Sequence, residues 1–459
     1  MPIYAIVLLL LVLVGFWVYP LVEPLWNPWQ MKGELNIAVA EFGQIGADGV
    51  ARSSDFGATL SQSVYDKLAM LYKDEFPELT QGKEGSVWIW HDSLGRIKNV
   101  HFGVMKGKNE GERAASAARL AERIGADMVI YGNVMDDGQR DQLQMEFYYR
   151  SDKLRSELDL ISGLYAFATI SIAGSFQADP TLAKRQINPP LANRTIAMFW
   201  LTVGLTYDVL GDPAKALQYF AVAVKEAAQE EGAINNALLY FLLGRSALFL
   251  HQDDAAEAYF QQALADDPHH VRSLLGLGTT YLQRARGLSH VERRQPPFYL
   301  QKAIETHQQA LALAQAAHDP FMVALARLAL AKSYRLQGST AGQLAEYDDA
   351  RRAFAATQSE LDQALAYLLT TKQVRLIAQA YEARGAAYYQ QAQVSSNQAD
   401  VQASKAEYEA AQTAYALCIA QGEKAPEDQL LQSQIIEQSC RVNYTKAAEQ
   451  LGRLEGEAK

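Results

Sequence analysis

A pattern of large and small residues that recurs after forty positions constrains the fold of this chain most. The pattern lies between Thr195 and Pro268. Its first copy consists of Trp200, Val203, Gly204, Ala216, Phe220 and Ala223, and its second of Tyr240, Leu243, Gly244, Ala256, Phe260 and Ala263. Small residues let consecutive helices pack closely, and aromatic side chains fill the space between them. The spacing therefore predicts helix–turn–helix units that stack along the chain.

This anchor pattern resembles the tetratricopeptide repeat. Three weaker copies follow, with anchors at Leu274, Leu277, Gly278, Tyr281 and His307, at Leu330, Ala331, Tyr334, Gly338 and Phe354, and at Tyr381, Gly385, Tyr388 and Tyr415. The resemblance implies an all-α superhelix of about five repeats over residues 195–425, with a concave surface formed by the first helix of each pair. A last helix within residues 426–459 is expected to cap the array.

Composition narrows the class of protein. With 459 residues and 49% hydrophobic residues, the chain has room for several domains. A net charge of −10 argues against a nucleic-acid-binding protein, which needs a basic footprint. Two cysteines, Cys418 and Cys440, exclude a disulfide-framework fold. We expect both to be structural thiols, and a disulfide between them is the alternative in an oxidising compartment.

The first 32 residues read as a membrane anchor. Ile3–Val22 contains no charged side chain and is long enough to cross the hydrocarbon core, and Trp17, Trp26 and Trp29 are typical of an interfacial aromatic belt. A cleaved signal peptide is the alternative, but a basic leading segment and a cleavage site are missing. We expect a single-pass protein of the cell membrane. The nearby charges do not determine which side the body occupies.

Residues 33–178 alternate between strand and helix patterns, which predicts a small α/β domain. The expected elements are strands at 35–39, 87–90, 100–105, 128–131 and 143–149, a helix capped by Asp55 that extends to Leu71, a helix at 110–124 and a turn at Asp137-Gly138. Pro180, Pro189 and Pro190 then predict a linker over residues 179–194.

The stretches LNIAVAEF and AARLAERIGADMVIYGNV resemble the TolB amino-terminal-like domain, which also occurs in the curli-secretion group of bacterial envelope proteins. The resemblance implies a non-enzymatic module for protein contact or assembly, and it favours an extracytoplasmic location. The order of anchor, α/β domain and repeats also resembles the sensory half of some membrane-anchored bacterial regulators. We expect no DNA-binding domain of the kind that those regulators carry before the membrane helix, which argues against a transcriptional role.

Motifs for chemistry are sparse. The glycine-rich stretch Gly43–Gly49 lacks the lysine and hydroxyl residue of a phosphate-binding loop, so we expect an ordinary turn. His269 and His270 fit the turn between repeats better than a metal site. No signature of a nucleophile appears, and no cofactor is predicted. We therefore expect a protein without catalytic activity.

The concave surface carries the sharpest hypothesis about a site. By their repeat positions, Arg245, Arg272, Lys332 and Arg335 should face it and would suit an acidic peptide. Ion pairs within the chain are the alternative role for these cations. Phe241 and Phe249 are candidates for groove anchors or for core residues. Arg327 occupies a position that points towards the helix seam.

Together these observations predict three parts: a transmembrane helix, a small α/β domain and an all-α repeat superhelix. The function that fits them is a membrane-anchored scaffold for protein–protein interaction or complex assembly. One alternative is a sensory protein whose α/β domain binds a small ligand, which a polar pocket beside Phe42–Ser54 would favour. A second is a hydrolase, which a cleft with strongly shifted titratable groups would favour.

Overall fold

The computed structural model describes residues 30–46, 48–80, 86–91, 102–136, 141–150, 163–167, 169–172, 180–229, 236–288, 298–371, 373–426, 428 and 431–457. The chain forms two compact units, and the described residues divide between Leu242 and Leu243. We call the first the sheet unit and the second the repeat unit. The predicted membrane span lies outside the described residues, and among those that are described no helix is long and apolar enough to cross a membrane.

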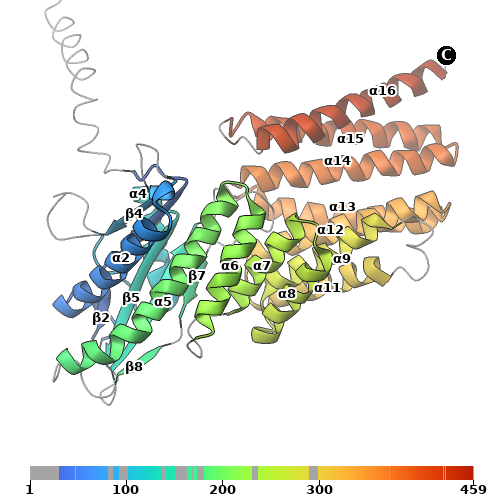
Figure 1. Ribbon diagram of the computed structural model, residues 1–459. Coiled ribbons are helices and arrows are strands. Elements are labelled where there is room, and N and C mark those ends of the chain that lie inside the picture. The colour runs from blue at the N-terminus through green and yellow to red at the C-terminus, as the bar shows by residue number, and fades with distance from the viewer. Residues whose placement is uncertain are drawn as a thin grey trace, which may run out of the picture. The chain divides into compact units, whose positions relative to one another are not determined.

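The sheet unit is built on a mixed sheet (Figure 1). Strand β1 (Leu35–Val39) pairs in parallel with β4 (Val87–His91) and with the start of β5 (Met128–Asp136). Strand β2 (Gly43–Ile45) pairs in parallel with the end of β5 and antiparallel with β3 (Ala51–Arg52). Strand β6 (Asp141–Tyr149) returns antiparallel along the whole of β5, and β7 (Gly163–Ala166) and β8 (Ile170–Ile172) pair with β6.

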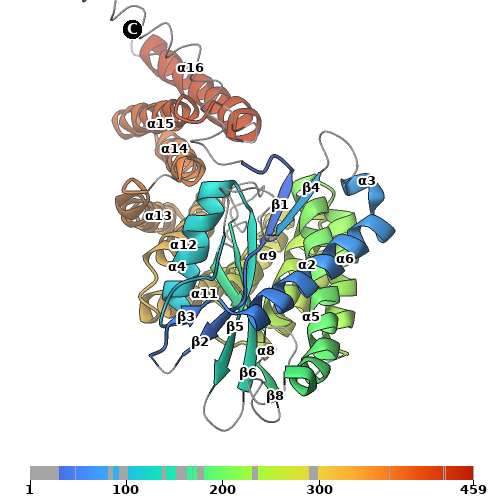
Figure 2. The ribbon, with the colours of Figure 1, turned by 90° about the vertical axis from the view of Figure 1, so that its left-hand side faces the viewer.

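Helices cover both faces of this sheet (Figure 2). Helix α4 (Glu110–Ile124) begins at the N-cap Asn109 and packs Ala117, Leu120 and Ile124 against Val129 and Tyr131 of β5. Helix α2 (Asp55–Glu75) and the short α3 (Pro77–Thr80) lie at the other face. Residues 128–134 are buried without a break, as the apolar run predicts for a strand covered on both sides.

Two local predictions within residues 33–178 are wrong. Ser54, not Asp55, caps α2, because its Oγ accepts a hydrogen bond of 3.1 Å from Gly57 N. The described part of the predicted strand at 100–105 makes a single bridge, between Val104 and Glu41. Gly103 adopts a left-handed conformation (φ 61°), which interrupts the extended backbone.

The segment predicted as a linker belongs to a helix, α5 (Pro180–Val209), which contains Pro189 and Pro190. Each proline removes a backbone donor and disfavours a helix interior. Ala183, Ile187, Leu191 and Met198 are nevertheless buried at helical spacing. Burial of this apolar stripe therefore offsets the local cost of the two prolines. Helix α6 (Pro213–Ala227) follows, capped by Asp212 as the Asp-Pro sequence predicts.

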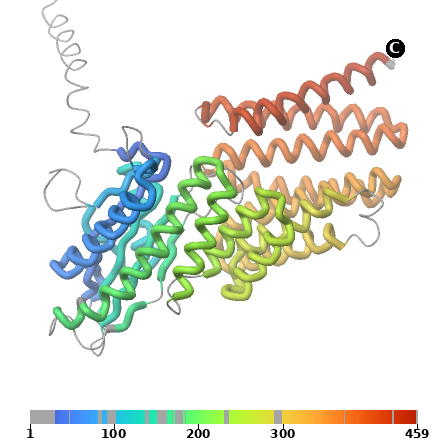
Figure 3. The backbone as a smooth tube through the Cα atoms, in the orientation of Figure 1, coloured from blue at the N-terminus to red at the C-terminus, as the bar shows by residue number. Residues whose placement is uncertain are grey.

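Five helical pairs among the described residues match the predicted repeat frame. Their backbone runs from green to orange in Figure 3. The first is α5 with α6, inside the sheet unit. Helix α7 (Asn236–Phe249) runs across the division between the units. The later helices are α8 (Asp253–Asp266), α9 (Val271–Gly287), α11 (Phe298–Ala316), α12 (Pro320–Gln343), α13 (Tyr347–Leu368), α14 (Val374–Asn397) and α15 (Val401–Gly422).

The predicted glycine and aromatic anchors meet in every pair. A Cβ atom added to Gly244 would lie 2.8 Å from the Phe260 ring, and one added to Gly385 would lie 2.7 Å from the Tyr415 ring. Gly204 faces Phe220, Gly338 faces Phe354, and in the third pair Gly278 faces His307. The close approach of each helix to its partner therefore depends on these glycines.

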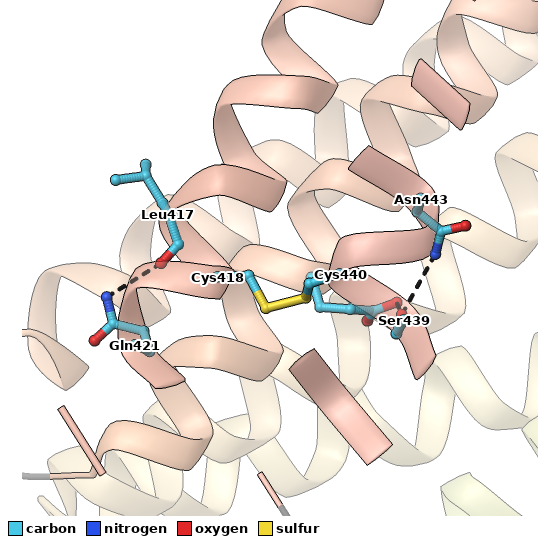
Figure 4. Close-up of a disulfide and its surroundings, with 7 residues drawn as sticks. Leu417, Cys418, Gln421, Ser439, Cys440 and Asn443 are labelled. Atoms are coloured by element: carbon cyan, nitrogen blue, oxygen red, sulfur yellow. Dashed lines mark hydrogen bonds between the residues drawn. A yellow bond between two sulfur atoms is a disulfide. The ribbon is translucent and has the colours of Figure 1, made fainter. Parts of the chain in front are cut away.

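A π-helical stretch (Leu431–Arg441) and α16 (Val442–Glu457) close the array, where we predicted a capping helix. Cys418 on α15 and Cys440 on the π-helical stretch form a disulfide with a Cα–Cα distance of 6.3 Å (Figure 4). The expectation of two unpaired structural thiols is therefore wrong. Both sulfurs are buried, so the bridge lies inside the packing between α15 and the cap.

Candidate functional site

A pocket of about 270 Å³ lies among the first helices of the later repeats. We call it the groove pocket. Lys332 and Arg335 of α12 line it, together with Arg286 of α9 and Glu382 of α14. Among the described residues that line it, Arg286, Lys332 and Arg335 are cationic and Glu382 is anionic, in a chain of net charge −10. These helices are the ones that the repeat frame assigns to the concave surface.

Arg335 and Glu382 are held in place by their own contacts. Arg335 Nη1 donates to Gln390 Oε1 at 3.4 Å, whereas its buried Nε has no hydrogen-bond partner. Glu382 Oε1 accepts from Ser439 Oγ at 3.0 Å. A buried donor without a partner is costly, so an oxyanion that enters the groove pocket would find a donor already directed by the fold.

The other two predicted cations lie elsewhere. Arg245 is only 1% exposed, and its guanidinium lies 5.0 Å from the centre of the Phe249 ring. Arg272 is half-buried in the first turn of α9 and is not among the residues that line the groove pocket. The four cations therefore do not form one continuous stripe. Lys332 and Arg335 are brought together, and Arg245 and Arg272 are not part of the same pocket.

The two phenylalanines proposed for the groove differ in exposure. Phe241 on α7 is fully buried, whereas Phe249 is 40% exposed and stacks on Arg245. Arg327 lies at the helix seam, as predicted, where its Nη1 pairs with Glu360 Oε2 of α13 at 2.6 Å. Of these three residues, only Phe249 presents a substantial apolar surface to solvent.

Sequence reasoning missed Arg286 and Glu382. Arg286 stands in the last turn of α9, beyond Tyr281, the last anchor that the repeat frame places on this helix. Glu382 directly follows the anchor Tyr381, so its position beside the frame was visible in the sequence. Its proximity to Arg335 depends on how α14 packs against α12, which no spacing within one helix reveals.

His307 lies beside the groove pocket but is itself fully buried. Burial and, to a smaller extent, the nearby Lys332 lower the pKa of His307 to about 4, against a backbone hydrogen bond that raises it. Its Nδ1 lies 2.9 Å from Ser333 Oγ, which is also fully buried. A serine and a histidine at this distance resemble part of a nucleophilic site, but a substrate could not reach this hydroxyl in the described conformation.

The remaining sequence candidates have structural surroundings. His270 Nδ1 lies 2.7 Å from Ser273 Oγ at the start of α9, and burial lowers its pKa to about 4. His269 is exposed in the turn that precedes α9. In the parts of the chain that the structure describes, no group of three His, Cys, Asp or Glu side chains is placed to hold a metal ion.

A second polar pocket, of about 880 Å³, lies in the sheet unit beside the loop that follows β1. Arg52 and Ser53 line it, and both belong to the Phe42–Ser54 segment singled out in the sequence. Its other cations, Lys106, Arg119 and Arg123, come from distant parts of the chain, namely the segment before α4 and α4 itself.

No protein-family model and no curated protein sequence matches the chain. The crystal structure of a thermophilic TPR protein from Thermus thermophilus is 20% identical, covers 55% of this chain and 98% of its own, and has a TM-score of 0.34. The crystal structure of MamA protein is 15% identical, with coverages of 51% and 95% and a TM-score of 0.28. A circular tandem repeat protein is 11% identical, with coverages of 61% and 75% and a TM-score of 0.23.

The architecture itself supports a coarse description. Five consecutive helical pairs share one frame of glycine and aromatic contacts, and a mixed α/β sheet precedes them. The chain is thus an α/β sheet region followed by an all-α array of helical repeats.

Proposed function

We propose that this chain is a membrane-anchored, non-catalytic scaffold whose repeat array binds an acidic segment of a protein partner. The groove pocket is the observation that carries the proposal. Lys332, Arg335 and Arg286 line it, and they lie on helices that the repeat frame assigns to the concave side of the array. Repeat arrays of this type use that side to bind extended or helical segments of other proteins.

Charge supports an acidic partner. The chain as a whole is acidic, so a local excess of cations creates a contrast that orients an approaching peptide. Arginine binds carboxylates through parallel hydrogen bonds, and Arg335 holds a buried Nε without a partner for such a bond. Glu382 sets a limit on the charge that the pocket accepts and favours a peptide with a lysine or amide near its carboxylates.

The disulfide supports an extracytoplasmic body. Buried disulfides persist in oxidising compartments and are rare in reducing ones. Cys418 and Cys440 are bonded in the repeat unit, which would then lie outside the cytoplasm. The apolar segment Ile3–Val22 supplies the anchor in this proposal.

Binding is tested with the full chain as bait in detergent-solubilised native membranes. The variant Lys332→Glu, Arg335→Glu reverses two charges in the groove pocket, and we expect it to weaken capture of a specific partner at least tenfold. The matched control is Arg351→Glu, Arg352→Glu, which reverses two exposed charges on α13. A captured partner is then identified, and its acidic segments are titrated as peptides by fluorescence anisotropy.

A second variant, Lys332→Gln, Arg335→Gln, guards against unfolding caused by placing new carboxylates beside Glu382. Circular dichroism and thermal unfolding must show that each variant is folded. If wild type, groove variants and control capture the same partners equally, the groove pocket does not bind the partner and the proposal fails.

Membrane attachment is tested separately. Alkaline carbonate extraction should leave the full chain in the membrane pellet and release a chain that begins at Gln30. Proteolysis of intact cells and of opened cells then reports the side on which the body lies. Release of the full chain by carbonate would contradict the anchor without bearing on the groove.

A further inference from the structure

The sheet unit contains a pocket of about 880 Å³ that we call the basic pocket. It is formed by the β2–β3 hairpin, the segment Phe102–Lys106 and one face of α4. This volume falls within the range of about 300–1,000 Å³ typical of small-molecule sites. Its described lining residues all belong to the sheet unit, so they form the pocket without the repeat array.

The base of the pocket is apolar and fixed. Phe102, Met105 and Leu120 line it and are buried in the core between α4 and the sheet. Ser116 Oγ accepts a hydrogen bond of 3.3 Å from Lys106 N, which ties the Phe102–Lys106 segment to α4. A ligand would therefore meet a preformed apolar surface, suited to a planar or hydrocarbon body.

The rim is strongly basic. Arg52, Lys106, Arg119 and Arg123 line the pocket, and neither aspartate nor glutamate is among the lining residues that the structure describes. Arg52 is paired with Asp48 at 2.5 Å, but both side chains are more than half exposed, and such surface pairs exchange readily for other partners. Across the described residues, no carboxylate forms an ion pair with Lys106, Arg119 or Arg123.

The two arginines of α4 that line the pocket favour a bound anion. Arg119 and Arg123 are four residues apart on the exposed part of the helix and both line the pocket. Like charges at this spacing repel and destabilise a helix. The helix dipole favours a cation in the last turn, where Arg123 stands, but it does not favour a second cation at Arg119. An anion bound between the two guanidinium groups would relieve this repulsion.

We propose that the basic pocket binds a small soluble organic molecule that carries two or more phosphate or carboxylate groups on an apolar or planar body. The guanidinium groups of Arg119 and Arg123 bind its oxyanions, Lys106 and Arg52 contribute charge, and the Phe102–Leu120 surface contacts its body. The site is independent of the proposed scaffold function, since it lies in the other compact unit.

The test is calorimetric titration of the full chain in detergent with three probes: ATP, benzene-1,3,5-tricarboxylate and soluble dihexanoyl phosphatidylglycerol. ATP and the tricarboxylate represent the two anion types. We expect at least one of these two to bind with a Kd below about 1 mM, a Kd that rises with NaCl concentration. The variant Arg119→Gln, Arg123→Gln should weaken that binding at least tenfold.

The matched control is Arg351→Gln, Arg352→Gln, which removes two exposed arginines from α13 in the repeat unit. It should leave the Kd of the same probe unchanged. Thermal unfolding midpoints of both variants must stay close to that of the wild type. As a second readout, the bound probe should raise the midpoint of the wild type and not that of Arg119→Gln, Arg123→Gln.

Three results would overturn the proposal. The first is that neither ATP nor the tricarboxylate binds. The second is that the α4 variant and the α13 control weaken binding equally, which would mean nonspecific attraction to positive charge. The third is that only the short-chain lipid binds through Arg119 and Arg123, which would identify the pocket as a contact for membrane lipid.

Discussion

A histidine occupies the aromatic position of the third helical pair. Phe220, Phe260 and Phe354 fill the same position in other pairs, each against a glycine of the partner helix. His307 packs against Gly278 in the same way, and its Nδ1 lies beside Ser333 Oγ. Position in the repeat frame therefore fixes how the ring packs, while the choice of histidine adds a proton equilibrium that phenylalanine lacks.

This substitution makes stability depend on pH. Burial holds the pKa of His307 near 4 in the folded chain, below its ordinary value of 6.5. The unfolded chain then binds more protons between these values, so stability falls as pH drops through this window. The expected loss from His307 between pH 8 and pH 5 is about 2 kcal/mol. His270, whose pKa is also lowered to about 4, contributes in the same direction.

The variant His307→Phe isolates this contribution. Urea unfolding at pH 8 and pH 5 should show a smaller loss of unfolding free energy in the variant than in the wild type, by about 2 kcal/mol. His269→Phe, which changes an exposed histidine, is the control and should keep the wild-type difference. An equal pH dependence in all three chains would show that His307 is protonated without cost in the folded state.

A contact between two residues could be predicted from the sequence where their spacing along the chain alone determines that they meet. The glycine and aromatic anchors are of this kind, and each predicted pair meets in the structure. Arg245 shows the limit, because its place in the repeat frame indicated the concave face and its guanidinium is buried beside Phe249. The position of a residue on a helix indicates which way its side chain points, whereas its burial depends on which neighbouring residues pack over that side of the helix.

At the scale of elements, the capping helix is joined to the array covalently. Cys440 lies at the end of the π-helical stretch, and Cys418 lies on α15, 22 residues earlier in the chain. The sequence alone could not pair them, because the spacing within one helix does not reveal which face of the cap meets α15. The same limit applies to α5, where local proline signals indicated a linker and tertiary burial produced a helix.

We expect reduction of this disulfide to loosen the end of the array. Closing a loop of 22 residues lowers the conformational entropy of the unfolded chain, which adds about 3 kcal/mol to the unfolding free energy in the loop-entropy model. Because each repeat contacts mainly its neighbours, the effect should be confined to α15, the π-helical stretch and α16. Hydrogen exchange measured by mass spectrometry should show faster exchange there after reduction, and unchanged exchange in α9 and α12.

The double variant Cys418→Ala, Cys440→Ala provides the control for the reductant. It should exchange rapidly in the same helices under oxidising conditions and show no further change on reduction. If reduction leaves the wild-type exchange of α15 and α16 unchanged, the bridge does not stabilise the cap.

At the scale of the whole molecule, the first helical pair, α5 with α6, belongs to the repeat frame by its sequence and to the sheet unit by its contacts. Its anchors follow the repeat frame, and its contacts join it to the sheet unit. Tyr72 of α2 donates a hydrogen bond of 2.8 Å from its hydroxyl to Thr202 Oγ1 of α5 and packs edge-on against Phe199. Phe76 contacts Trp200 and Tyr219. A frame read along the sequence assigns this pair to the array, since contacts between α2 and α5 leave no periodic signal.

We therefore predict that the sheet region folds independently only when it includes α5 and α6. A fragment of residues 30–229 should unfold cooperatively with native near-ultraviolet circular dichroism, and a fragment of residues 30–178 should not. Without α5 and α6, Tyr72 and Phe76 lose their aromatic partners, and exposure of their apolar area costs roughly 5 kcal/mol or more. That loss is comparable with the entire unfolding free energy of a typical domain, about 5–15 kcal/mol.

Tyr72→Phe in the longer fragment removes only the hydrogen bond to Thr202 and should lower the unfolding free energy of that fragment by about 1 kcal/mol. Cooperative unfolding of residues 30–178 with native-like aromatic signals would instead place the boundary before α5 and return the first helical pair to the repeat array.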